Sequence, residues 1–122
     1  MAANDVEDRL GRLRAICLAL PETTENLSHG QPAFSVAGKM FCYFWADVHG
    51  DGLTRACVKT AGRDEQEMLL DADPEVFSKL PYLHAAGWIG MDIALAETDW
   101  AHVAARVAAS WRLAAPRRLA ED

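Results

Sequence analysis

The sequence predicts an α+β fold: a two-layer sandwich in which an antiparallel sheet of four or more strands carries the N- and C-terminal helices on one face. Apolar residues recur at helical spacing near both ends of the chain. Between them lie stretches rich in β-branched and aromatic residues, separated by glycine-containing turns. The 122 residues have the length of one domain, so we expect a single domain over residues 1–122.

Composition is that of an ordinary globular protein, with 51% hydrophobic and 25% charged residues. No apolar run reaches about 18 residues, and the first residues lack a basic stretch followed by an apolar one. We therefore expect no membrane span and a cytoplasmic location. Cys17, Cys42 and Cys57 have no metal-like spacing, which favours free, buried thiols. The net charge of −6 opposes a polyanionic partner.

The first helix is expected over residues 5–20, with Asn4 as its N-cap and Pro21 as its stop. A polar connection over residues 22–29 follows. A β-hairpin then turns at Ala37-Gly38.

A two-residue turn there assigns the hairpin side chains to two faces. We expect the more aromatic face to carry Phe34, Val36, Phe41, Tyr43 and Trp45, joined by Ala56 and Val58 from a strand over residues 53–60. The other face is mixed and carries Ser35, Met40, Cys42, Phe44, Arg55, Cys57, Lys59, Trp88 and Asp92. A three-residue loop with a bulge before residue 53 would invert this assignment.

The second half of the chain predicts two short helices, over residues 63–70 and 73–80. The clearest alternation, over residues 87–95, predicts a strand whose aliphatic side chains face the helices. Thr98 or Asp99 then caps a final helix that ends at Pro116. Arg117 and Arg118 are expected in a loose basic tail.

Several short motifs follow one another along the chain: Gly30-Gln-Pro-Ala-Phe34, Gly38-Lys39-Met-Phe41, Val58-Lys59, Pro81-Tyr82-Leu83, Gly87-Trp88-Ile89 and Ser110-Trp111. In this order and spacing they resemble the MmcQ/YjbR family over nearly the whole domain. The resemblance implies a compact fold akin to the frataxin-like sandwich. It also implies a DNA-binding role, inferred for the family from a "double wing" likeness to a phage transcription factor domain, and it brings no defining reaction.

The residues that match the family's motifs are Lys39, Lys59, Tyr82, Trp88 and Ser110. Where some relatives have basic residues before the tryptophan, this chain has His84-Ala85-Ala86-Gly87. Fewer cations there weaken phosphate contact, which dominates nucleic-acid affinity, so we expect any DNA binding to be weak.

The candidate site lies on the mixed face and is expected to bind nucleic acid or another ligand through Lys39, Arg55, Lys59, Tyr82, His84 and Trp88. Lys59 and Arg55 would supply charge and Trp88 a stacking surface. Plainer readings are a solvated face around Lys59, a tryptophan packed under a loop, a Tyr82 that pins its loop, and a Ser110 bonded to a backbone carbonyl.

Two functions from different classes follow. The first is a DNA-binding domain that uses this basic and aromatic face. The alternative is a non-catalytic small-molecule or protein-binding module on the same face, which tolerates the acidic surface more easily. The histidines and cysteines lack metal-ligand spacing, and no nucleophile or phosphate-loop motif occurs, so we expect no enzyme, no metal and no cofactor. The oligomeric state is left open.

Overall fold

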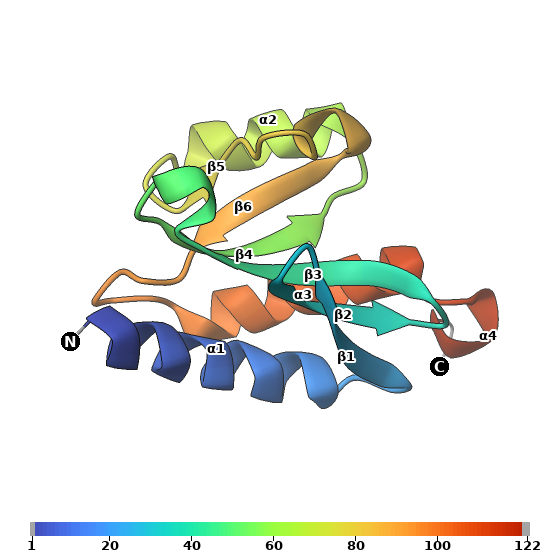
Figure 1. Cartoon of the computed structure of the whole chain (residues 1–122). Coiled ribbons are helices and arrows are strands. Elements are labelled where there is room, and N and C mark those ends of the chain that lie inside the picture. Colours follow the sequence, from blue (N-terminus) through green and yellow to red (C-terminus); the bar gives the residue numbers. More distant parts are fainter. Residues whose placement is uncertain (1, 121–122) are drawn as a thin grey trace.

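The computed structural model describes residues 2–120, in which a six-stranded antiparallel sheet carries helices from both ends of the chain on one face (Figure 1). The predicted α+β sandwich is therefore confirmed. The elements are α1 (Ala2–Leu18), β1 (Thr23–Ser28), β2 (Gln31–Val36), β3 (Lys39–Ala46), η1 (Val48–Gly50), β4 (Thr54–Lys59), α2 (Arg63–Ala72), β5 (Phe77–Ser78), η2 (His84–Ala86), β6 (Trp88–Asp92), α3 (Trp100–Ala114) and α4 (Arg117–Ala120).

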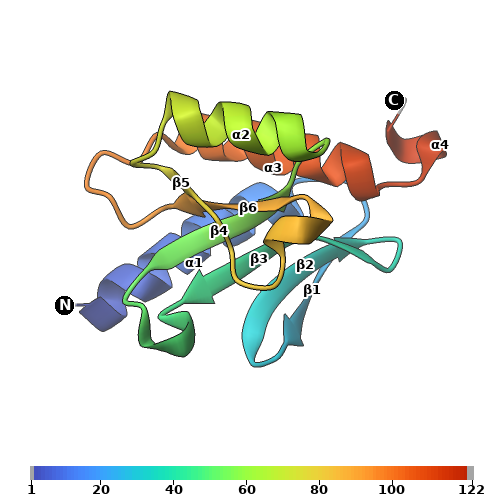
Figure 2. The same ribbon diagram turned by 90° about the horizontal axis from the view of Figure 1, so that it is seen from above.

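The strand order is β1-β2-β3-β4-β6-β5, and every neighbouring pair is antiparallel. The first four strands follow one another through short turns. The chain then leaves the sheet through α2, and β6 returns between β4 and the short edge strand β5 (Figure 2). Helix α2 lies beside this edge, where its Glu65 meets Arg106 of α3 at 3.3 Å.

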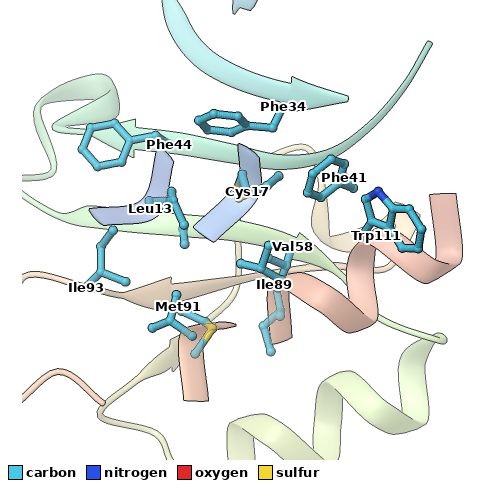
Figure 3. Packing of buried hydrophobic residues seen from close by; sticks show 14 of the residues in the cluster. Leu13, Cys17, Phe34, Phe41, Phe44, Val58, Ile89, Met91, Ile93 and Trp111 are labelled. Carbon is cyan, nitrogen blue, oxygen red and sulfur yellow. The ribbon is translucent and has the colours of Figure 1, made fainter. Parts of the chain in front are cut away.

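The main core lies between the sheet and the two terminal helices (Figure 3). Its fully buried side chains come from α1, from α3 and from alternate positions of the central strands. They include Leu13, Cys17, Phe34, Phe41, Val58, Ile89, Met91, Ile93, Val103 and Val107. The aliphatic side chains of β6 face the helices, as the alternation predicted.

The polar segment after the first helix is a strand and not a connection. Residues Thr23–Ser28 form β1, which pairs along its whole length with β2. An edge strand with one face in solvent needs few apolar residues. The polar composition of this segment therefore gave no sign of a strand. The start of the first helix also differs from the prediction. Helix α1 begins at Ala2, so Asn4 lies inside it and not at its N-cap position.

Two later segments also differ from expectation. The helix predicted over residues 73–80 is a turn followed by the short strand β5, which pairs with β6. The basic tail is not loose, because Arg117–Ala120 form the short helix α4. Asp99 is the N-cap of α3 and accepts a hydrogen bond from the His102 backbone N–H, so the predicted start of the last helix is confirmed.

The predicted division of the β3 side chains between the two faces is confirmed for Met40 and Phe41 and wrong from Cys42 onward. Phe34 pairs with Cys42 and Ser35 with Met40, so a bulge at Phe41 shifts the register. The bulge places Phe41 in the helix-side core together with Cys42 and Phe44. Tyr43 and Trp45 consequently move to the opposite face.

The loop after β3 restores the expected assignment of β4. The Asp47 backbone N–H donates to the Leu53 carbonyl, which leaves an odd number of residues, 48–52, in the loop. Ala56 therefore faces the helices as predicted, while Arg55 and Lys59 point the other way.

This opposite face has a small core of its own. Cys57, Leu80 and Trp88 are buried there, with Met40, Tyr43, Trp45 and Leu83 packed against them. The segment between β5 and β6 supplies Leu80 and Leu83, so it covers part of the sheet. Within residues 2–120, no helix combines the length and apolar character that crossing a membrane requires.

Candidate ligand site on the second sheet face

Lys59 and Trp88 are cross-strand partners on the face that points away from α1 and α3. The Lys59 Nζ lies 5.7 Å from the centre of the Trp88 ring, and the Tyr43 ring centre lies 5.0 Å from it. Trp88 is only 6% exposed. Its ring is therefore packed under the loop before β6 and offers little surface on which a nucleic-acid base could stack.

Arg55 is also buried, with 4% of its side chain exposed. Its guanidinium donates to Asp51 at 2.8 Å and to the Ser78 hydroxyl at 3.4 Å, and lies 6.0 Å from the centre of the Trp45 ring. Its charge is therefore neutralised inside the protein. An arginine so enclosed offers little charge to a phosphate and instead ties Asp51 and the edge strand β5 to β4.

The other three predicted site residues belong to a hairpin tip, a turn and a loop. Lys39 is exposed at the tip of the β2–β3 hairpin. His84 belongs to the turn η2, where its carbonyl accepts a hydrogen bond of 2.8 Å from Gln66 Nε2. Tyr82 is 85% exposed on the loop just before it.

A hollow of about 620 Å³ opens on this face, near the point where β3 leaves the sheet. Its volume is within the range of small-molecule pockets. It is lined by Ser28, His29, Gln31, Tyr43, Trp45, Asp47, Val48, His49, Tyr82 and Leu83. Of the six residues predicted from the sequence, Tyr82 alone belongs to this lining.

Aromatic rings form much of the lining. Tyr43 and Trp45, both on β3, have ring centres 6.2 Å apart with planes tilted by 39°. His49 and Tyr82 come from two separate loops and meet edge to face at 6.0 Å. Segments far apart in the sequence thus bring four rings to one hollow.

The backbone around the hollow is held in an uncommon conformation. His29, Asp47, His49 and Tyr82 have φ angles of 52°, 54°, 56° and 68°. Six non-glycine residues with positive φ occur in the described part of the chain, and four of them line this hollow. Such residues cost about 1–2 kcal/mol each and tend to cluster where ligands bind.

Asp47 supplies the hollow's charge. Its Oδ1 accepts a hydrogen bond of 2.7 Å from the Gly52 N–H, which closes the loop after β3. Among the lining residues in the described part of the chain, it is the only carboxylate, and none is lysine or arginine.

The Tyr43 phenol is tuned by its surroundings. Burial is the main cause that raises the pKa of Tyr43 above its usual value, and Cys57 adds to it, while a hydrogen bond with Ser28 opposes it. The phenol therefore stays neutral and able to donate a hydrogen bond across the physiological range.

The three cysteines are free and buried, and none lines the hollow. Burial raises the pKa of both Cys42 and Cys57, so these thiols stay protonated near neutral pH. Within residues 2–120, no group of three or more histidine, cysteine or acidic side chains is placed to hold a metal ion.

Comparison with known proteins gives the chain a family. A model of the YjbR family matches residues 18–113. The chain belongs to the YjbR family.

A crystal structure of Deinococcus radiodurans protein DR2400, which carries the domain DUF419, resembles this YjbR-family fold with a TM-score of 0.67. It is 20% identical and aligns over 83% of this chain and 74% of its own, a likeness that supports the fold alone. No curated protein matches the sequence.

Sequence reasoning missed most of this YjbR chain's hollow for a local reason. Tyr43 and Trp45 were assigned to the helix side because the bulge at Phe41 has no sequence signal of its own. A signal did exist in Asp47-Val-His49-Gly50, because aspartate and histidine are among the residues that tolerate positive φ. We expected only a turn over residues 49–52 in this part of the chain.

Proposed function

We propose that this YjbR-family chain is a non-catalytic binding module that holds a small molecule in the hollow between Trp45 and Tyr82. The observation that carries the proposal is the convergence of aromatic rings from β3 and two loops around one space of ligand size. Small-molecule sites are concave and lined mainly by apolar and aromatic groups, with a few polar atoms to fix orientation.

The floor of the hollow is braced from behind, which supports a preformed site. Arg55 lies over the ring of Trp45, and the Trp88 ring packs on Tyr43. A side chain added at Gly90 would come within 2.8 Å of Leu80 and 3.0 Å of Arg55, so this layer is tightly packed. Rigid walls reduce the entropy lost on binding.

DNA binding, implied by the family resemblance, is the second candidate. Lys39, exposed at the tip of the β2–β3 hairpin, favours it. Against it, at least six of the twelve lysines and arginines are already in ion pairs with carboxylates, and the net charge is −6. Cations that are already paired with carboxylates contribute less to phosphate contact, so we favour the small-molecule module.

The proposal of a non-catalytic role rests on the chemistry of the lining. Ser28 and His29 are neighbours in the sequence, but no hydrogen bond joins a lining histidine to a lining serine or tyrosine among the bonds of the described residues. A nucleophile activated by an adjacent base needs such a pair.

The test is an NMR screen of ¹⁵N-labelled protein against a mixed set of neutral, anionic and cationic fragments. We expect several fragments to shift the signals of residues that line the hollow. Tyr82→Asn should make these shifts smaller because it removes a ring from the lining. Asparagine is chosen because it tolerates the left-handed backbone at this position. A parallel titration with double-stranded DNA at low salt should leave these signals unmoved. Shifts caused by DNA alone would favour the second candidate.

A further inference from the structure

We infer that the hollow selects an organic cation, a small molecule that carries an alkylated ammonium group. This inference rests on the proposed function, since it names the ligand class of the same hollow. It draws on three independent properties of the lining: its charge, its rings and its separation from the protein's own cations.

The charge of the lining favours a cation. With histidines counted as neutral, Asp47 gives the lining a formal charge of −1. One of its carboxylate oxygens is used by the Gly52 N–H, and the side chain remains exposed. The net charge of −6 for the whole chain adds a long-range attraction for cations and repels anions.

The rings provide the second property. The faces of tryptophan and tyrosine attract cations, and alkylated ammonium groups are commonly held by cages of such rings. Tyr43 and Trp45 lie together on β3, and the ring centre of Tyr82, on the loop before η2, lies 6.0 Å from that of His49. The lining therefore offers an ammonium group these rings together with the Asp47 carboxylate.

The protein's own cations are kept out of this space. Arg55, which lies over Trp45, forms an ion pair of 2.8 Å with Asp51, so its charge is compensated. Lys59 lies over Trp88. Neither of the two cations, Arg55 and Lys59, belongs to the lining. The hollow therefore combines aromatic walls with a carboxylate and has no basic side chain of its own.

We infer a small molecule as the ligand because the hollow has a volume of about 620 Å³. This space holds an ammonium group together with a body of drug-like size. The same group also occurs as trimethyllysine in proteins, so the experiment must separate the two sources.

The deciding pair of probes is choline and its uncharged isostere 3,3-dimethyl-1-butanol, titrated by NMR. We expect choline to shift the signals of Tyr43, Trp45 and Tyr82 and to bind about tenfold more tightly than the isostere. A short peptide carrying trimethyllysine should bind no more tightly than choline. Tighter binding of the peptide would indicate that the natural ligand is a protein that carries trimethyllysine, and would overturn the assignment to a small molecule.

Matched variants separate charge from shape. Asp47→Asn keeps the side-chain acceptor and suits the positive φ, and should weaken choline binding about two- to fivefold. Asp71→Asn changes the net charge equally on the exposed side of α2 and should have no effect. Tyr82→Phe should retain binding, whereas Tyr82→Asn should lose about threefold or more.

Equal affinity for choline and the isostere, or no effect of Asp47→Asn, would overturn the cation assignment. The proposed function would then survive if neutral or anionic fragments still shifted the hollow's signals. If no fragment of any class bound there, the proposed function itself would fail. The two failures are thus distinguishable in the same set of spectra.

Discussion

Ser110 shows how one buried hydroxyl repairs the irregularity in the sheet. Its Oγ donates to the Phe41 carbonyl and accepts from the Lys59 N–H, the latter at 2.8 Å. The ladder between β3 and β4 ends at the pair Cys42 and Val58, so it does not join these two backbone groups to each other. The prediction that this serine bonds a backbone carbonyl is confirmed.

The first prediction is that Ser110→Ala destabilises the protein. Two buried backbone groups would lose their partner, which costs about 1–3 kcal/mol. Denaturant unfolding would measure the change in free energy at constant slope. A change below about 0.5 kcal/mol, typical of surface sites, would show that water or a shifted strand satisfies Phe41 and Lys59.

The second prediction concerns the cysteines. Burial raises the pKa of Cys42 and Cys57, so little reactive thiolate forms at neutral or mildly alkaline pH. All three cysteines, Cys17 included, should react slowly with a thiol reagent in the native state and fully in denaturant. A single thiol that reacts at once in the native protein would contradict this packing.

At the scale of elements, the terminal helices and the central strands could be predicted because their patterns are long. Helix α3 shows apolar residues at helical spacing over four turns, and β6 shows strict alternation. The bulge at Phe41 and the odd-numbered loop over residues 48–52 carry no such pattern, yet each exchanges the two faces of a strand.

The third prediction tests how α3 docks. Trp111 is 6% exposed beside Phe41, and its Nε1 donates to the Pro21 carbonyl at 3.2 Å (Figure 3). Trp111→Ala should cost about 3–5 kcal/mol in denaturant unfolding. Trp111→Phe is the matched control, which keeps most of the packing and should lose about 1–2 kcal/mol. Equal small losses for both would contradict this docking.

At the scale of the whole molecule, the site is assembled from distant segments. Gln31, Trp45, His49 and Tyr82 belong to a strand start, a central strand, a turn and a late loop. Sequence reasoning could select Tyr82 through its motif, but it could not bring these segments together. It also selected Arg55 and Trp88, which contact the lining residues Trp45 and Tyr43 but do not themselves line the hollow.

The distribution of charge also belongs to this scale. Ion pairs such as Arg14 with Glu25 at 2.6 Å tie elements together and offset part of the positive charge. The sequence gives the net charge of −6 but not which cations are paired. The pairing of these cations is one reason why we propose a small-molecule module in preference to DNA binding.

The most direct test of the central claim is affinity selection of small molecules followed by mass spectrometry. The wild-type protein and Gln31→Trp, which fills the hollow with an indole, would be equilibrated with the same small-molecule extract, after melting curves show that both are folded. We expect at least one compound to be retained by the wild type and lost from Gln31→Trp. Identical sets of retained compounds would contradict a ligand site in this hollow.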